Sequence, residues 1–486
     1  MMYIPSRKQQ WQPSKAKRSA EHPTKMMDYS KYSFWLETAG DDLTPRPALA
    51  RSIDVDVAVL GAGYTGLWTA YYLLKRNPGL KIALIEKEIV GFGASGRNGG
   101  WCSSKFPVSP RMLEHRYGVD AARALMLAMN DAVDDVARVC QEEGIDAHYH
   151  KGGILTLARG DHHLPMLRSS FDAYSRLGLG QQYRLCSASE AQERIRVTNV
   201  HGALFAAENA SIHPGRLVRG LARAFEKRGG LIYERTEVTD FNGGPSPRFV
   251  TSAGEIRAKD AIVLAGESYL TRLPELHRAV LPVYSLITLT EPLTPSQWSQ
   301  IGWQNRESLA SCNYTVDYLT RTADRRILFG SRGAPYRLGS KISDEQDRHA
   351  ATHQRIQQLV TDWFPMLEGV NFTHAWGGPV AMPRDWMPMT EFDSATKIAT
   401  ARGYTGQGVS TTNLTGRVLA ELISGKRSEL SRLPIAQRHS PSWEREPLRW
   451  IAVRYMQNAF SRIDEAGRQG KRPPIDAPLA QFLGRH

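Results

Sequence analysis

The residues most suited to chemistry in this sequence are three glycines near residue 60. Gly61, Gly63 and Gly66 have the spacing G-x-G-x-x-G and directly follow the apolar run Val55–Leu60. In a dinucleotide-binding turn the first glycine allows a tight bend, the second lets the backbone approach a pyrophosphate, and the third lets a helix pack on the strand. Amides at the start of such a helix face the phosphate charge. We therefore expect the segment that opens at Asp54 to bind a dinucleotide.

The elements needed to hold this turn follow in the expected order. The run Val55–Leu60 suits a strand that is buried on both faces of a parallel sheet. A helix is predicted behind Gly66 and ends at Asn77-Pro78-Gly79, and a second strand over Lys81–Ile85 leads to Glu86. Glu86 lies 20 residues after Gly66, where an acid can accept hydrogen bonds from ribose hydroxyls and would repel a 2′-phosphate. This order argues against an ordinary glycine-rich turn.

Two further glycine-rich segments favour FAD over a nicotinamide. Gly91–Gly100 contains five glycines in ten residues, which gives a small surface along which an extended cofactor can lie. Within it, Arg97 and Asn98 are the polar side chains placed to meet the flavin. Far along the chain, Gly403–Gly408 precedes a predicted helix over Val409–Ile423. The start of that helix would offer amides and a positive dipole end to the negative charge of a reduced flavin.

The composition is that of an ordinary globular protein. The 486 residues, 41% hydrophobic and 23% charged, are enough for two domains. The net charge of +13 is concentrated toward both ends, and we interpret it as solvated tails with no nucleic-acid partner. The four cysteines have no C-x-x-C spacing, which indicates reduced thiols and no metal site. The sequence has no apolar run long enough for a membrane span and no secretory signal, so we expect a cytoplasmic protein.

The alternation of strand-like and helical segments predicts an α/β fold (α+β overall). We expect an FAD-binding Rossmann-like domain that is interrupted by an antiparallel-sheet substrate domain. The expected ranges are an N-terminal leader, 1–50; FAD-binding parts, 51–110, 200–275 and 375–426; substrate-domain parts, 111–199 and 276–374; and a C-terminal helical extension, 427–486.

At this point the sequence resembles the D-amino-acid-oxidase-like family of FAD-dependent oxidoreductases, and within it the gamma-glutamylputrescine oxidoreductase branch. The motifs that carry the resemblance are spread over nearly the whole chain: Gly61–Leu67, Gly93–Gly100, His213-Pro214-Gly215, Thr290–Leu293, Trp376-Gly377-Gly378 and Gly403–Gly408.

The resemblance implies oxidation of a C–N bond by hydride transfer to the flavin, imine hydrolysis, and reoxidation by oxygen or another acceptor. It also implies an antiparallel sheet over the flavin. Some relatives tether the flavin through a cysteine near Trp376 or a histidine in the first flavin loop; this chain has neither, so we expect noncovalent FAD. Cys102 and Cys312 are interpreted as core thiols. The cofactor-binding residues expected are Gly61, Gly63, Tyr64, Thr65, Gly66, Glu86, Lys87, Ala94, Ser95, Arg97, Asn98, Gly99, Gly100, Val238, Ala265, Gly266, Gly403, Gly406, Gln407 and Gly408.

Flavin-dependent amine oxidation needs no fixed acid–base triad, so the sequence identifies the substrate site less clearly than the cofactor site. We expect Tyr284, Tyr318 and Arg321 to orient a substrate and Trp376 to form an apolar wall, with ordinary sheet packing as the alternative for each. Arg321 would hold an anionic group of the amine, although strand alternation could turn Thr320 inward instead. The other functions considered are a tRNA-modifying flavin oxidase and a non-catalytic electron-transfer flavoprotein.

Overall fold

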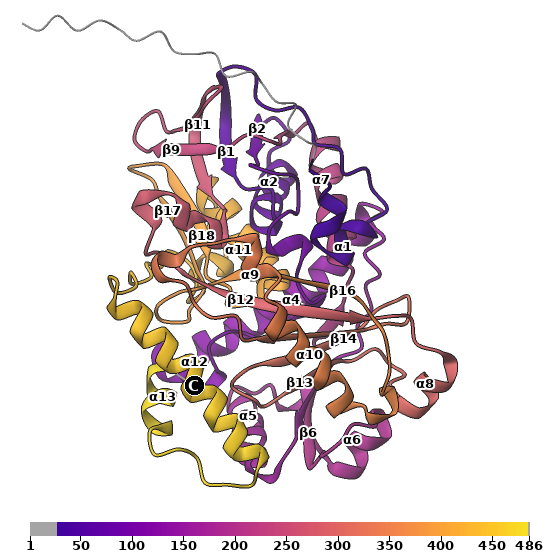
Figure 1. Ribbon diagram of the computed structural model, residues 1–486. Coiled ribbons are helices and arrows are strands. Elements are labelled where there is room, and N and C mark those ends of the chain that lie inside the picture. The colour runs from indigo at the N-terminus through magenta and orange to yellow at the C-terminus, as the bar shows by residue number, and fades with distance from the viewer. Residues whose placement is uncertain (1–26, 485–486) are drawn as a thin grey trace, which may run out of the picture.

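The structure is a computed structural model that describes residues 27–484. It contains two eight-stranded sheets and a separate two-stranded pair, β3 (Trp101–Ser103) and β7 (Asn209–Ser211). In Figure 1 the first sheet occupies the upper part of the molecule and the second sheet the lower part. The α/β fold class expected from the sequence is confirmed.

The first sheet contains β1, the strand that leads into the glycine turn. Its order is β17-β18-β11-β1-β2-β8, and the neighbours from β18 to β8 are parallel, while β9 and β10 form an antiparallel addition to β11. The strands are β1 (Ile53–Leu60), β2 (Ile82–Ile85), β8 (Leu231–Tyr233), β9 (Val238–Asn242), β10 (Arg248–Thr251), β11 (Gly254–Leu264), β17 (Met389–Asp393) and β18 (Ile398–Arg402).

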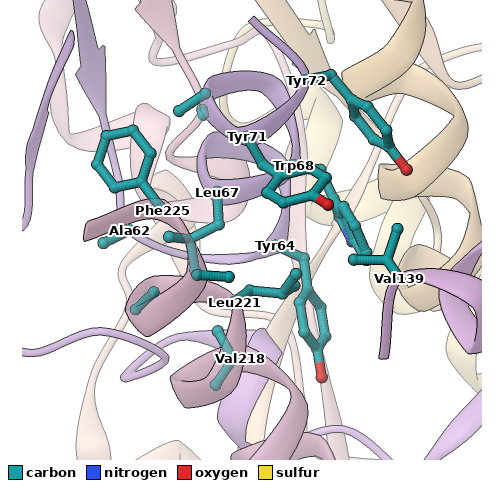
Figure 2. Packing of buried hydrophobic residues seen from close by; sticks show 14 of the residues in the cluster. Ala62, Tyr64, Leu67, Trp68, Tyr71, Tyr72, Val139, Val218, Leu221 and Phe225 are labelled. Carbon is teal, nitrogen blue, oxygen red and sulfur yellow. The ribbon is translucent and has the colours of Figure 1, made fainter. Parts of the chain in front are cut away.

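Helices cover one face of this sheet and form its main core. They are α2 (Tyr64–Arg76), α7 (Pro214–Lys227), α11 (Gly408–Ile423) and the end of α4 (Val119–Glu142). Leu67 of α2 packs beside Leu221 and Phe225 of α7, and Trp68 lies toward Val139 of α4 (Figure 2). Because α2 is buried along most of its length, its first turn is held rigidly at the end of β1.

The second sheet has the order β16-β12-β15-β14-β13-β4-β6-β5 and is antiparallel except for the pair of β13 and β4. The strands are β4 (Ile154–Ala158), β5 (Tyr183–Ser187), β6 (Gly202–Ala206), β12 (Leu281–Thr290), β13 (Ser308–Ser311), β14 (Asp317–Arg321), β15 (Ile327–Arg332) and β16 (Phe372–Met382). The helices α5 (Leu164–Arg176), α6 (Ala188–Arg194), α8 (Pro295–Ile301) and α10 (Ala350–Trp363) accompany it.

Some sheet memberships differ from the expected ranges. β6 lies within 200–275 and β16 begins just before 375, yet both pair in the second sheet, so the chain returns to the first sheet later than expected each time. Helix α4 lies within 111–199, but its last turns pack in the core of the first sheet. The sequence pattern of an apolar strand or helix is the same in either sheet, because only its long-range partners decide which sheet it joins.

The two ends of the described chain both pack on this framework. Residues 1–26 of the expected leader lie outside the described part, but α1 (Phe34–Glu37) is not loose, since Trp35 is 2% exposed and its indole donates to Asn98 O (2.7 Å). This segment supports the Gly91–Gly100 loop from behind. At the other end, α12 (Leu448–Arg468) and α13 (Ala477–Gly484) lie against the second-sheet side (Figure 1). Within residues 27–484, no helix is long and apolar enough to cross a membrane.

Candidate active site

A cavity of about 1410 Å³ lies at the carboxyl ends of β1 and β2. Leu60 and Ile85 line it where these strands end, and Ser285, Ile287 and Tyr318 of the second sheet line it as well. The carboxyl end of a parallel sheet is where α/β folds bind their ligands. The volume exceeds the 300–1,000 Å³ that is typical of one small-molecule pocket. The cavity therefore has room for an extended cofactor and a substrate together.

The glycine turn forms one wall of this cavity and has no space for side chains. Gly61 has φ +102°, and a Cβ there would lie 2.9 Å from Ala265 O. A Cβ on Gly66 would lie 2.0 Å from Gly61 O, so only glycine lets α2 approach the turn. The Tyr64 amide donates to Ser95 Oγ (2.8 Å), which ties the turn to the second glycine-rich loop.

Glu86 lies next to this turn with its carboxylate in the cavity wall. Its two oxygens accept from the backbone amides of Ala62 and Glu88, both at 3.0 Å. Burial raises the pKa of Glu86 to about 7 despite these hydrogen bonds. Beside it, Lys87 also lines the cavity and pairs with Glu237 (2.6 Å). Burial disfavours the charged form of this carboxylate. Hydrogen-bond donors of a ligand, such as ribose hydroxyls, would stabilise the charged form.

In the loop over Gly91–Gly100 the polar side chains mainly stabilise the conformation of the loop. Arg97 donates to Asp347 (2.6 Å) and to Phe92 O (2.7 Å), so its charge is neutralised within the protein. The Asn98 amide bonds the backbone of its own loop, where its oxygen accepts from Gly100 N (2.9 Å). Both residues line the cavity, but they shape the loop more than they offer free charge.

The third glycine-rich segment closes the cavity from the side of α11. Glu267 accepts from the amides of Gly403 (3.0 Å) and Tyr404 (3.2 Å), and the Tyr404 hydroxyl lies 2.9 Å from Thr65 Oγ1 on α2. These bonds fix the turn so that Gly406, Gln407 and Gly408 face the cavity at the start of α11. The positive end of a 16-residue helix is thereby directed at the ligand space.

Most residues expected at the cofactor line this one cavity. They are Gly61, Gly63, Tyr64, Thr65, Glu86, Lys87, Ala94, Ser95, Arg97, Asn98, Gly99, Val238, Ala265, Gly266, Gly406, Gln407 and Gly408. Gly66, Gly100 and Gly403 are not in its wall but allow the close packing behind it. A groove without side chains, a buried acid and a helix N-terminus are the features that FAD requires, so these residues fit the cofactor.

Of the residues expected to orient a substrate, Tyr318 lines the cavity. Its hydroxyl lies 2.8 Å from Ser285 Oγ, and its ring packs edge-on against Trp101 with centroids 5.8 Å apart. A Cβ on Gly99 would lie 2.4 Å from this ring, so Tyr318 lies directly over the flavin loop. Burial raises the pKa of Tyr318 to about 12, and the hydroxyl stays neutral at ordinary pH.

The other three expected substrate residues lie elsewhere, because side chains alternate along each strand. The hydroxyl of Tyr284 accepts from Ser343 N (2.9 Å) and its ring is in the core behind the second sheet. Arg321 donates to Trp303 O and stacks over Trp298 at 4.3 Å.

Trp376 is 3% exposed and its indole donates to Arg97 O (2.9 Å). It therefore supports the flavin loop and forms no wall of the cavity. Between Tyr318 and Arg321, Thr320 is the side chain that turns inward, bonding Gly99 O at 2.6 Å.

Arg332, at the end of β15, and Lys105, just after β3, are among the cations that line the cavity without having been predicted from the sequence; Arg111 and Arg272 line it as well. Neither Arg332 nor Lys105 lies in a recognisable motif, although Arg332 ends a strand predicted to belong to the substrate domain. Cys312 also lines the cavity, whereas Cys102 is fully buried in the first-sheet core. Cys312 also packs against buried apolar residues, which agrees with its interpretation as a core thiol, although one side of it faces the cavity.

A family model described as DAO, FAD dependent oxidoreductase, matches residues 56–422 of this chain. The chain belongs to this family of FAD-dependent oxidoreductases. Gamma-glutamylputrescine oxidoreductase of Escherichia coli (strain K12) is 32% identical over 396 residues, which cover 81% of this chain and 89% of that relative. The resemblance to that branch is therefore confirmed.

Solved structures show the same fold at lower identity. Glycine oxidase from Geobacillus kaustophilus is 21% identical, with a TM-score of 0.64 over 79% of this chain and 98% of that one. L-amino acid deaminase from Proteus vulgaris is 18% identical, with a TM-score of 0.65 over 84% of this chain and 99% of that one. These matches support the two-sheet architecture of the FAD-dependent oxidoreductase.

Proposed function

We propose that this FAD-dependent oxidoreductase oxidises the C–N bond of a small amine or amino acid, with FAD held noncovalently. The observation that carries the proposal is the continuity of one cavity, from the glycine turn and Glu86 to a second lobe under Tyr318. Names of similar proteins, among them gamma-glutamylputrescine oxidoreductase and glycine oxidase, support an amine as the substrate.

When bound, the flavin supplies a two-electron acceptor for hydride from the carbon next to nitrogen. The residues of the chain bind, orient and exclude water. Tyr318, over Gly99, would press the substrate toward the flavin, and its neutral hydroxyl with Ser285 would offer a hydrogen-bonding pair but no strong base. The start of α11 would stabilise the negative charge of the reduced cofactor. The amine must arrive neutral, and the imine product would be hydrolysed after release.

We further propose that the amine carries an anionic group. Arg321, which was predicted to hold this group, lies outside the cavity, and Arg97 in the cavity wall is paired with Asp347. The support now comes from Arg332 and Lys105, which line the cavity without an ion pair among the described residues. Uncompensated cations in an enclosed site favour an anionic ligand. A cytoplasmic location, no nucleic-acid partner, and reoxidation by oxygen or another acceptor complete the proposal.

The test is reduction of the bound flavin under anaerobic conditions by a panel of polyamines, N-methyl amino acids and D-amino acids. Bleaching of the flavin, with hydrogen peroxide or a reduced acceptor formed once air or a quinone is admitted, is the expected outcome. A flavin that no amine on the panel reduces, although dithionite does, would refute amine oxidation.

A further inference from the structure

A short turn over residues 383–388 connects the two sheets beside the cavity. It joins β16 of the second sheet to β17 of the first. The Thr405 amide donates to Ala381 O (3.1 Å), and a Cβ on Gly403 would lie 2.9 Å from the Pro383 ring. The turn therefore packs directly against the third glycine-rich segment, which precedes α11.

The same turn also contacts α3 (Pro110–Tyr117), where Arg116 donates to Asp385 O (3.3 Å). Two other residues of this helix, Arg111 and His115, line the cavity and are exposed. Met166 of α5 also lines the cavity and is 38% exposed. The cavity thus opens to solvent at α3 and α5, and the turn lies between this opening and the glycine-rich segment.

Trp386, in this turn, has a backbone conformation that is unusual for a bulky residue. Its φ is +63°, in the left-handed region that glycine and asparagine adopt most readily. The conformation is held from outside, since Arg438 and Ser440 both donate to the Asp385 carboxylate. The Trp386 amide donates to Pro383 O (3.1 Å) and closes the turn.

The Trp386 side chain is half-buried and lines the cavity. It packs against the apolar cluster that contains Leu113 of α3 and against the cluster that contains Met382 and Trp443. Glycine or asparagine would form the same turn with less strain, so a tryptophan that is kept there at a cost in free energy indicates a use for the indole. Its place between the opening and the flavin segment points to control of access.

We propose that Trp386 is a specificity-determining residue whose indole limits the width of the molecules that pass from the opening at α3 and α5 to the flavin. Narrow molecules pass the indole, whereas molecules with fused rings are delayed or excluded. The inference requires FAD in the cavity, and it goes beyond the proposed amine oxidation because it concerns access to the flavin, whichever amine reduces it.

The experiment measures access to the flavin without an amine. Holoenzyme is reduced by light and EDTA without oxygen and mixed with 1,4-benzoquinone, 1,4-naphthoquinone or 9,10-phenanthrenequinone, each of which takes two electrons from the reduced flavin. Reoxidation is followed by flavin absorbance, and each rate constant is divided by the wild-type value for the same quinone, which cancels differences in potential. In Trp386→Gly we expect the rate constants of the two wider quinones to rise roughly tenfold or more, and that of benzoquinone to stay within about threefold.

Two further variants of Trp386 grade the effect. Trp386→Phe keeps a narrower ring and should give an intermediate rise, while Trp386→Asn tolerates the same φ and should resemble Trp386→Gly. If Trp386→Gly does not retain FAD, the order Trp, Phe, Asn still tests the inference. The control is Arg325→Gly, because Arg325 has φ +66° but is exposed and lies outside the cavity wall. Its rate constants should match wild type for all three quinones.

Unchanged rate constants in the Trp386 variants, or an equal rise for narrow and wide quinones, would overturn the role of the indole. A rise in Arg325→Gly like that in Trp386→Gly would do the same, since released backbone strain would then explain it. The result is independent of amine oxidation. Discrimination by width that depends on Trp386 would uphold the inference even if no amine bleached the flavin, and bleaching by an amine would not rescue it.

Discussion

Glu86 makes the cofactor site testable through pH. In the cofactor-free protein burial raises the pKa of Glu86 to about 7, from an ordinary value near 4.5. Its oxygens already accept from the amides of Ala62 and Glu88. Ribose hydroxyls that donate to the charged form would lower this pKa again, so FAD binding should release a proton below pH 7. The affinity for FAD should therefore rise with pH.

The size of this pH effect on FAD affinity follows from the shift in the pKa of Glu86. Each pH unit below the pKa adds about 1.4 kcal/mol to the cost of ionising the group, so affinity should fall by about 25-fold between pH 7.5 and pH 5.5. The stability of the cofactor-free protein should move in the opposite sense. A carboxyl with a raised folded-state pKa contributes stability below about pH 4.5 and loses it as the pH rises through about 7. Replacing Glu86 by Gln should weaken FAD binding at pH 8 by ~1.5–3 kcal/mol, or about 10- to 150-fold.

The assay is titration of the cofactor-free protein with FAD, followed by quenching of flavin fluorescence, at several pH values. In Glu86→Gln the slope between pH 5.5 and 7.5 should disappear, while in the surface control Glu255→Gln it should persist. A change in affinity below twofold, with the pH slope unaltered, would show that Glu86 does not bind the ribose. Glu267 also has a pKa raised to about 7 by burial, so a slope lost only in Glu267→Gln would assign the titration to the flavin end.

Acid precipitation should leave intact FAD in the supernatant, and flavin that remains with the pellet would contradict noncovalent binding. Gly66→Ala places a Cβ 2.0 Å from Gly61 O, so we expect loss of FAD and a Tm lowered by several degrees; a yellow protein with the original Tm would contradict this. Arg332→Met should lower kcat/KM about tenfold or more on an anionic amine and less on its neutral amide, whereas Arg321→Met should change it less than twofold on either; the reverse pattern would restore Arg321 to the site. Asp464→Asn removes a charged acceptor from two amides of the loop beside Lys105 and should raise KM several-fold with kcat within twofold; weakened FAD binding instead would contradict that role.

The fold and the cofactor-binding segments could be predicted because their signals are local. A buried strand, three glycines and an acid lie within about 30 residues, and each has one physical reason for its place. The order of strands in the second sheet could not be predicted this way. Nothing within β6 or β16 says which sheet it joins, since their partners are far away in sequence. The expected boundary at 200 therefore assigns β6 to the other sheet, and the boundary at 375 falls inside β16.

The substrate residues were harder to predict because the alternation of side chains along a strand decides which of them face the cavity. Tyr318 and Thr320 face the flavin loop, so Arg321 must face the other way and stacks on Trp298. A one-residue change of register reverses this assignment, and the sequence alone does not fix the register. Lys105 was missed for a different reason. It lies in a turn without periodicity, and the cavity that it lines is assembled from segments far apart in the sequence.

Two helices of the C-terminal extension contact one segment of the cavity wall. The family match ends at residue 422, yet Gln481 of α13 lines the cavity and donates to the Tyr314 hydroxyl (2.9 Å). Asp464 of α12 accepts from the amides of Tyr314 and Thr315, at 3.0 and 2.8 Å. These contacts hold the 312–316 segment, most of which lines the cavity. The flavin end is thus built from segments within the family match, while the 312–316 segment of the cavity wall is held by helices beyond it.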